Sequence, residues 1–332
     1  MQRTNAARSG QQQLLTDNVA FTNLHPSPGD SRSEILAGLH APQKSINPKY
    51  FYDEQGSRLF EAITRQPEYY PTRTEVNILR ANAAEIASAC GPDCVLIEPG
   101  SGNCEKVRYL LAALAPRAYV PMDISADFLQ QAAQELGGEY PDLAIHALCA
   151  DFNMDGDAMP ALPSAKRIIF YPGSTIGNLE PGAAQAFLLR LKSWTGADGG
   201  ALIGVDLHKS TAVLDAAYND KQGITAQFNL NILRHINTVV DAEFNPEAFR
   251  HHAFYASDKQ RIEMHLVSKL AQSVRCNGDT IKLEPGEKIQ TEYSYKYTVP
   301  GFQELARSAG LTVRRSWLDD EQLFSVHYLE PG

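Results

Sequence analysis

A glycine-containing turn after an apolar run is the first place where this sequence could do chemistry. Glu98 ends the run, and Gly100 and Gly102 follow ahead of a helix predicted over Glu105–Leu114. Glycine lets the backbone come close to a ligand, and the start of a helix offers unpaired N–H groups. A dinucleotide-binding loop has a third glycine where this chain has Cys104, so the loop by itself does not identify its ligand.

Acidic residues end three successive apolar runs. Glu98 would repel a pyrophosphate but suits a ligand that carries sulfonium and ammonium charges. Asp123 could accept hydrogen bonds from both hydroxyls of a ribose. Asp151 could accept from an adenine amino group while Phe152 packs on the base. Taken singly, each acid is better explained as a helix cap or turn former. Together they favour an adenosyl ligand, with a nicotinamide dinucleotide as the competing interpretation.

Alternating apolar runs and helical patterns must position these loops, and they predict an α/β fold with a Rossmann-like, doubly wound sheet. Ligands of such sheets bind at the carboxyl ends of the strands. Strands are expected at Cys94–Glu98, Ala118–Met122, Ala144–Cys149, Arg167–Tyr171, Ala201–Asp206, Thr312–Trp317 and Phe324–Leu329. Helices are expected at Glu105–Leu114, Ala126–Leu136, Gly182–Trp194 and Phe302–Ala309.

The residues between Asp206 and Pro300 interrupt this alternation and predict an inserted α+β lobe. Its pattern gives helices at Ala212–Tyr218 and Thr225–Val239, then strands at Arg261–Leu270 and Lys288–Tyr297. Residues 1–33 are rich in Gln, Ser, Asn and Gly and are expected to form a mobile leader. We therefore predict a cofactor-binding sheet domain over residues 72–207 and 298–332, and a substrate-binding lobe over residues 34–71 and 208–297.

Composition narrows the class of partner. The chain has 332 residues, a formal net charge of -9 and no run of Lys or Arg, which argues against nucleic acid or an anionic membrane as its partner. No apolar stretch is long enough to span a bilayer. The 5 cysteines form no CxxC pair, which favours a reducing cytoplasm. Neither metal-ligand spacing nor a hydrolase nucleophile elbow is present, so no metal is expected.

Several longer strings carry a family resemblance. They are Tyr52–Phe60, Ile63–Arg73, Gly100–Lys106, Gly173–Asn178, Arg261–Met264 and Thr291–Lys296. From roughly residue 30 onward the chain resembles the histidine-specific Nα-methyltransferases of ergothioneine biosynthesis. The wider family includes N-methyltransferases of tryptophan derivatives, and the Glu292-x-Ser294 string is what points to histidine.

The resemblance implies a class I methyltransferase sheet that binds S-adenosyl-L-methionine. It assigns the cofactor to Gly100, Lys106, Asp123, Asp151 and Phe152. One departure from the family is Pro99, where a leucine is usual; proline lacks an N–H, so a hydrogen bond there could be lost.

The resemblance also implies an amino-acid pocket and a monomer. Tyr52 is the catalytic candidate, since it matches the family tyrosine nearest the reacting nitrogen. The substrate-binding candidates are Tyr69, Gly173, Asn178, Tyr218, Glu292, Tyr293 and Ser294.

These residue types suit methyl transfer to an amine. The reaction is an in-line displacement that depends on positioning, and Asn178 and Tyr52 could orient the nitrogen lone pair. Tyrosine rings such as Tyr69 attract a methylated cation by about 0.5–2 kcal/mol each. Glu292 could accept from one imidazole N–H while Ser294 pairs with the other nitrogen, because residues two apart on a strand share a face. The alternative is an edge strand with a solvated Glu and Ser.

The leading hypothesis is conversion of L-histidine to its N,N,N-trimethyl form. A second keeps the chemistry but takes another amino acid, such as tryptophan or a histidine derivative. A third is a non-catalytic protein that binds the cofactor or an amino acid. Lys296 and Arg261 are expected to be surface or lobe-packing cations, and Met264 either lines the pocket or packs in the core.

Overall fold

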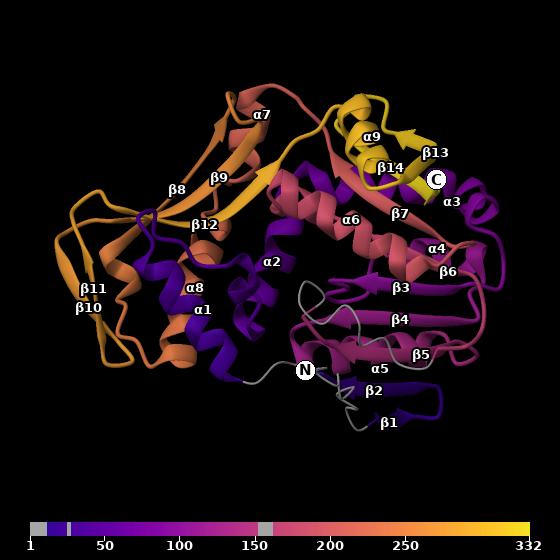
Figure 1. The fold of residues 1–332 in the computed structure, drawn as a ribbon, viewed down its shortest axis with the longest axis horizontal. Helices are drawn as coiled ribbons and strands as arrows, with labels where there is room; N and C mark the ends of the chain where they lie inside the picture. The colour runs from indigo at the N-terminus through magenta and orange to yellow at the C-terminus, as the bar shows by residue number, and fades with distance from the viewer. Residues whose placement is uncertain (1–11, 25–27, 152–161) are drawn as a thin grey trace, which may run out of the picture.

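The computed structural model describes residues 12–24, 28–151 and 162–332, and its largest element is a nine-stranded sheet in the order β1-β2-β5-β4-β3-β6-β7-β14-β13 (Figure 1). Neighbouring strands from β2 to β7 are parallel, while β1, β14 and β13 each pair antiparallel with their neighbours. The strands are β1 (Gln12–Thr16), β2 (Val19–Asn23), β3 (Val95–Pro99), β4 (Ala118–Asp123), β5 (Ala144–Cys149), β6 (Arg167–Tyr171), β7 (Gly200–Asp206), β13 (Leu311–Leu318) and β14 (Phe324–Pro331).

Helices cover both faces of this sheet because its central strands are apolar on both sides. In β3, Leu96 packs with α3, α4 and α5, whereas its neighbours Val95 and Ile97 face α6 and α9. Successive side chains of a strand point to opposite faces, so a continuous apolar run needs cover on each. The covering helices are α3 (Tyr70–Cys90), α4 (Arg108–Leu114), α5 (Ala126–Glu139), α6 (Pro181–Thr195) and α9 (Val299–Ser308). The predicted α/β, Rossmann-like sheet is confirmed.

A second body lies beside the carboxyl ends of the central strands (Figure 1). It combines a three-stranded antiparallel sheet, β12-β9-β8, with a β10-β11 hairpin and helices around α8. Its own buried cluster includes Phe51, Phe228 and Met264. The elements are α1 (Pro28–His40), α2 (Glu54–Thr64), α7 (Thr211–Ala217), α8 (Ile224–Val240), β8 (Phe249–Ala256), β9 (Arg261–Ser268), β10 (Gln272–Cys276), β11 (Asp279–Leu283), β12 (Lys288–Tyr295) and the short 3-10 helices η1 (Pro48–Phe51) and η3 (Pro246–Ala248). We call this body the lobe.

The prediction of a mobile leader over residues 1–33 is wrong where the structure describes that segment. Residues 12–23 form the β1-β2 hairpin, which extends the sheet beside β5, and α1 begins at Pro28. Val19 and Phe21 are buried, and the Asn18 amide donates to three carbonyl oxygens, those of Gly137, Tyr140 and Leu143, at 3.1 Å each. The polar composition of the segment hid this short apolar run.

One predicted boundary also differs near the glycine turn. The helix expected from Glu105 begins only at Arg108, so α4 is shorter and the preceding loop is longer. Lys106 therefore lies in the loop and not in the helix. No helix among the described residues is both long enough and apolar enough to cross a membrane.

Candidate active site

A pocket lies between the lobe and the carboxyl ends of β6 and β7. It brings together seven of the predicted residues from segments far apart in the sequence. Its lining consists of Tyr52, Phe60, Tyr69, Pro71, Gly173, Ser174, Thr175, Asn178, Asp206, Tyr218, Glu292, Ser294 and Lys296. We call it the amino-acid pocket.

Glu292 supplies an acidic group at the lobe side of the amino-acid pocket. It lies on β12 opposite Met264 of β9 and is only 8% exposed. Among the described residues, no donor lies within hydrogen-bond distance of its carboxylate. Burial raises its pKa to about 7, although the positive charge of Lys296 acts in the opposite direction. A buried carboxylate without a partner is costly, so this group is arranged for a donor from a ligand.

Ser294 lies two residues further along β12 and shares the face of Glu292. Its Oγ lies 2.8 Å from Lys296 Nζ and 2.9 Å from the Tyr218 hydroxyl. Lys296 is only 3% exposed, which excludes the surface position that was one of its two predicted alternatives. It directly follows β12 at two residues from Ser294, and both side chains line the pocket.

Asp206, at the end of β7, anchors this group of polar residues. Its carboxylate lies 2.7 Å from Lys296 Nζ and 2.6 Å from Lys209 Nζ, and it accepts a hydrogen bond from the Tyr70 hydroxyl. Burial alone would raise the pKa of Asp206, but the ammonium groups of Lys296 and Lys209 hold it below its usual range. The two cations and one anion are fully packed and form a rigid support for Ser294.

Aromatic rings form another wall of the amino-acid pocket. The ring centroids of Tyr69 and Tyr218 are 6.4 Å apart, those of Phe60 and Tyr69 are 6.3 Å apart, and those of Tyr52 and Phe60 are 5.9 Å apart. Burial holds the pKa values of Tyr52 and Tyr69 well above their usual range, so both hydroxyls stay protonated at neutral pH. These rings offer π faces and hydroxyl groups to an amino group.

The loop after β6 contributes Gly173 and Asn178. Gly173 has a positive φ of 79°, which glycine adopts without strain, and its N–H donates to both Glu75 carboxylate oxygens at 2.9 Å. The Ser174 Oγ accepts from the Asp206 N–H at 2.9 Å. The loop then turns through the 3-10 helix η2 (Thr175–Asn178), which places Asn178 at the pocket wall.

Two remaining residues of the strand pair do not reach the amino-acid pocket. Tyr293 lies on the opposite face of β12, where the Arg261 guanidinium carbon is 3.4 Å from its ring centroid. The prediction that Tyr293 binds substrate is therefore wrong, because neighbours on a strand point to opposite faces. Met264 packs in the core of the lobe. Arg261 is an interior cation that pairs with Glu263 at 2.6 Å.

The predicted cofactor residues gather at the carboxyl ends of β3 and β4. One Asp123 oxygen accepts from the Gly102 N–H and the other from the Ser125 N–H, both at 3.0 Å. Gly102 has a φ of 55°, and a Cβ added there would meet no atom within 4 Å. The turn is therefore held open beside Asp123. The two N–H groups after Pro99, at 100 and 101, both donate to the Met122 carbonyl, so these bonds hold the turn without an N–H at position 99.

Lys106 joins the glycine turn to the amino-acid pocket through Glu75. Its Nζ lies 2.6 Å from Glu75 Oε2, and the same carboxylate receives the Gly173 N–H. Glu75 lies on α3 and is completely buried. Gly100 has a φ of 71° and donates to the Met122 carbonyl at 2.7 Å. The Glu75 carboxylate therefore links the glycine turn, through Lys106, to the loop after β6, through the Gly173 N–H.

Two further acids lie near this edge. Glu98 is buried and hydrogen-bonded to Tyr119, and burial raises its pKa to about 8. Asp151 lies 3.0 Å from Lys49 Nζ, which also pairs with Glu34 at 2.6 Å. Phe152 lies outside the residues that the structure describes. The acids at three successive strand ends thus occupy one edge of the sheet.

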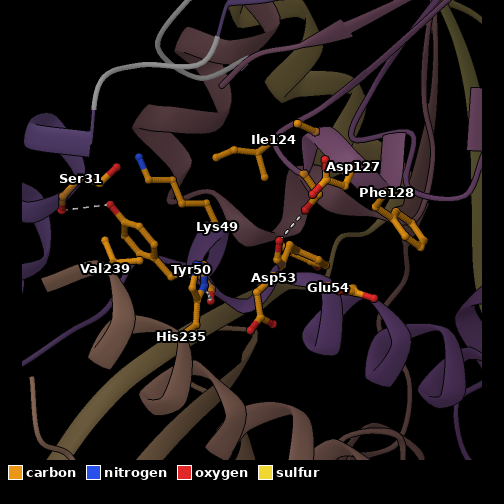
Figure 2. Close-up of a pocket in the computed structure, with 13 residues that line it drawn as sticks. Ser31, Lys49, Tyr50, Asp53, Glu54, Ile124, Asp127, Phe128, His235 and Val239 are labelled. Carbon is orange, nitrogen blue, oxygen red and sulfur yellow. Dashed lines mark hydrogen bonds between the residues drawn. The ribbon is translucent and has the colours of Figure 1, made fainter. Parts of the chain in front are cut away.

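A second cavity lies beside Asp123, between η1, the start of α5 and α8. Figure 2 shows Lys49, Tyr50, Asp127 and His235 around it. Tyr52 lines this cavity and the amino-acid pocket as well. A residue common to both spaces is suitably placed to contact the groups that react between them.

These residues fit an adenosyl cofactor. An acceptor fixed by two main-chain donors stands at the end of β4, next to an open glycine turn and a cavity. Three histidine, cysteine or carboxylate side chains suited to a metal ion do not come together anywhere in the described ranges.

Sequence reasoning missed Glu75 and Asp206 and misjudged Lys296. Asp206 ends a predicted strand, as Asp123 does, so the same argument could have found it. Lys296 follows Ser294 at the spacing that shares a strand face. Glu75 gave no signal, because its position in α3 resembles that of any polar residue in a helix.

Comparison with known proteins gives a consistent result. A family model described as "Histidine-specific methyltransferase, SAM-dependent" matches residues 31–331. A histidine N-alpha-methyltransferase of Mycolicibacterium smegmatis is 42% identical over 294 residues, covering 87% of this chain and 91% of that protein. The enzyme of the same name from Mycobacterium tuberculosis is 42% identical over 301 residues, covering 89% and 93%. Ergothioneine biosynthesis protein 1 of Neurospora crassa is 32% identical over 298 residues, covering 84% of this chain and 32% of that protein.

Proposed function

The chain belongs to the family of histidine-specific, SAM-dependent methyltransferases, and from that premise we propose that it methylates the α-amino nitrogen of L-histidine. The observation that carries the choice of histidine is the buried Glu292 carboxylate, which shares one face of β12 with Ser294 and has no donor from the described residues. An imidazole offers one N–H and one ring nitrogen at a spacing that these two groups can match.

Rejection of other amino acids follows from the same groups. A site built to hydrogen-bond its ligand rejects an apolar analogue by roughly 10⁴–10⁵, because the buried polar groups would stay unpaired. Leucine or phenylalanine would leave the Glu292 carboxylate without a donor and would offer no acceptor to the Ser294 hydroxyl. Rigid support from Lys296 and Asp206 keeps Ser294 from turning away.

The amino end of the substrate is assigned to the aromatic wall. Tyr52, Tyr69 and Asn178 line the pocket that also holds Glu292. The amine must be neutral when it attacks, so the amide of Asn178 and the hydroxyl of Tyr52 orient its lone pair. The neutral hydroxyls and the rings of Tyr52 and Tyr69 still interact favourably with the nitrogen after methylation has turned it into a permanent cation.

S-adenosyl-L-methionine, when bound, supplies an activated methyl carbon. Gly100, Lys106, Asp123 and Asp151 are the described residues that would hold it, with the Asp123 carboxylate directed by the Gly102 and Ser125 N–H groups. Tyr52 lines both the cavity beside Asp123 and the amino-acid pocket, so it is placed to align the cofactor with the substrate. The contribution of the chain is positioning.

We further propose that three transfers occur, giving N,N,N-trimethylhistidine. A wall of tyrosine rings tolerates the successive loss of N–H donors, because a cation is still attracted to each π face. A relative named for ergothioneine biosynthesis supports a role of the product in that pathway. We place the enzyme in the cytoplasm as a monomer; the 5 cysteines are all free and buried, which suits a reducing compartment.

Mass measurement tests the proposal directly. Purified protein is incubated with S-adenosyl-L-methionine and L-histidine, and mono-, di- and trimethylated histidine are followed with time. Accumulation of the trimethylated product is expected. If tryptophan competes successfully and is methylated in place of histidine, the substrate assignment is wrong. Stoichiometric binding with no product, even in a single turnover, would identify a binding protein.

A further inference from the structure

Lys296 has no proton left for a ligand. Its ammonium group carries three N–H donors and lies 2.7 Å from Asp206 Oδ2, 2.8 Å from Ser294 Oγ and 3.3 Å from the Tyr218 hydroxyl. An ammonium group donates and never accepts, so each of these three oxygens accepts a hydrogen bond from Lys296. Lys296 is thereby a fixed source of hydrogen bonds at the back of the amino-acid pocket.

The Ser294 oxygen then has its acceptor capacity filled. A hydroxyl oxygen has two lone pairs, and Ser294 Oγ receives Lys296 at 2.8 Å and the Tyr218 hydroxyl at 2.9 Å. The reverse arrangement, with Ser294 donating to Tyr218, is disfavoured because a phenol is the more acidic hydroxyl and the better donor. The proton of Ser294 has no other acceptor among the described residues and is free to point toward a ligand.

Charge acts in the same direction. Two ammonium groups, Lys296 and Lys209, share the single carboxylate of Asp206 in a nearly dry environment. This cluster carries a net positive charge next to Ser294. An imidazolium placed against the hydroxyl would be repelled by this cluster, whereas the far side of a bound imidazole would face the Glu292 carboxylate.

We propose that Lys296 and Tyr218 lock the Ser294 hydroxyl as a hydrogen-bond donor, so that the pocket takes the imidazole only in its neutral form, with the bare nitrogen toward Ser294 and the N–H toward Glu292. The inference rests on the proposed function and adds which protonation state and tautomer are selected. Lys296 is a positioning residue, since it acts through Ser294.

Other titratable groups around the ring belong to several elements. Glu292 comes from β12, Lys296 directly follows that strand, Asp206 comes from β7 and Tyr218 from the end of α7. Tyr52 and Tyr69 complete the wall. Their titrations affect every amino-acid ligand, so a pH experiment needs a ligand whose ring does not titrate.

Nitrogen NMR reads the ring directly. L-histidine labelled with ¹⁵N in the ring is bound to the full-length protein together with S-adenosyl-L-homocysteine. One pyrrole-type and one pyridine-type resonance are expected, and they should persist below the pH at which free imidazole becomes protonated. Two pyrrole-type resonances would show a bound imidazolium and would overturn the inference while leaving the proposed function intact.

Affinity measurements supply the second arm. Below about pH 6, the dissociation constant of histidine should rise about tenfold per pH unit relative to that of 3-(1,2,4-triazol-3-yl)alanine, whose ring stays neutral. In Tyr218→Phe and Lys296→Met, Ser294 regains a lone pair and can turn to accept, so this relative dependence should largely disappear. Tyr218→Phe keeps the ring and protects the test against misfolding of the lysine variant.

The outcomes separate the two proposals. An unchanged relative dependence in a folded Tyr218→Phe protein contradicts the lock, even if histidine is methylated normally. Failure of the wild-type protein to bind or methylate histidine removes the proposed function and, with it, the inference.

Discussion

The carboxylates of the cofactor edge differ from Glu292 of the amino-acid pocket in whether the protein itself supplies a donor. Asp123 has both oxygens engaged by main-chain N–H groups, Glu98 is bonded to Tyr119, and Asp151 is paired with Lys49. Glu292 is also buried but has no donor among the described residues. The first arrangement fixes a group in place before binding. The second leaves a carboxylate without a hydrogen-bond donor, and only a ligand that supplies this donor binds well, so Glu292 decides specificity.

Removing the Glu292 carboxylate, which has no donor among the described residues, should have the largest effect on catalysis. In Glu292→Ala, kcat/KM for histidine should fall roughly 100- to 1,000-fold, the cost of truncating one partner of a buried charge-assisted hydrogen bond. Steady-state kinetics measures it. Glu284→Ala, an exposed acid in the turn before β12, is the matched control and should behave as wild type. A loss below about fivefold would mean that Glu292 does not hold the substrate.

Removing Asp123, whose carboxylate is already hydrogen-bonded by the protein, should affect the cofactor and not the amino acid. Asp123→Ala removes the acceptor at the end of β4 and should weaken cofactor binding about 10- to 100-fold. Calorimetry with S-adenosyl-L-homocysteine reports the change, and Asp142→Asn, in the exposed turn before β5, serves as control. Histidine specificity relative to tryptophan should not change. If it does, the two regions are not separate in function.

The unpaired state of Glu292 should also cost stability in a pH-dependent way. Because its pKa in the folded protein is about 7, against 4.5 for an ordinary Glu, the folded state holds its proton more tightly than the unfolded state does. The contribution of Glu292 to stability therefore falls as pH rises from about 4.5 to 7. Glu292→Gln should raise the unfolding temperature by a few degrees at pH 8, for a gain of roughly 1–3 kcal/mol. Near pH 4 the two proteins should unfold alike, and an equal offset at both pH values would contradict the raised pKa.

The smallest effect is expected at Tyr293, whose side chain lies on the face of β12 opposite the pocket. Tyr293 lies between Glu292 and Ser294 but faces Arg261, so Tyr293→Phe should change kcat/KM for histidine by less than about twofold. Tyr218→Phe is its pair within the pocket and should lower affinity several-fold, because it removes a donor to Ser294. Similar losses in both variants would argue against the assignment of strand faces.

The same contrast explains what the sequence could predict. The cofactor edge follows a local rule, an acid directly after an apolar run, and Asp123 and Asp151 were found by it. The amino-acid pocket joins η2, α3, β7, α7 and β12, and no local pattern links Tyr69 to Ser294; only the family resemblance did. Glu75 escaped because its partners, Lys106 and Gly173, are distant in sequence, and Lys296 was misjudged because its partner Asp206 is distant as well. Tyr293 was wrongly included because a motif was read as a continuous string when a strand alternates.

The N-terminal hairpin has a practical consequence for anyone who shortens this chain. A version beginning at Glu34, chosen to remove a supposedly loose start, would strip β1 and β2 from the sheet and expose the backbone of β5 along its whole edge. Unpaired strand edges invite association between molecules. It would also remove Val19 and Phe21 from the core and leave three carbonyls of the α5–β5 segment without the Asn18 amide. Trimming should therefore stop ahead of Gln12.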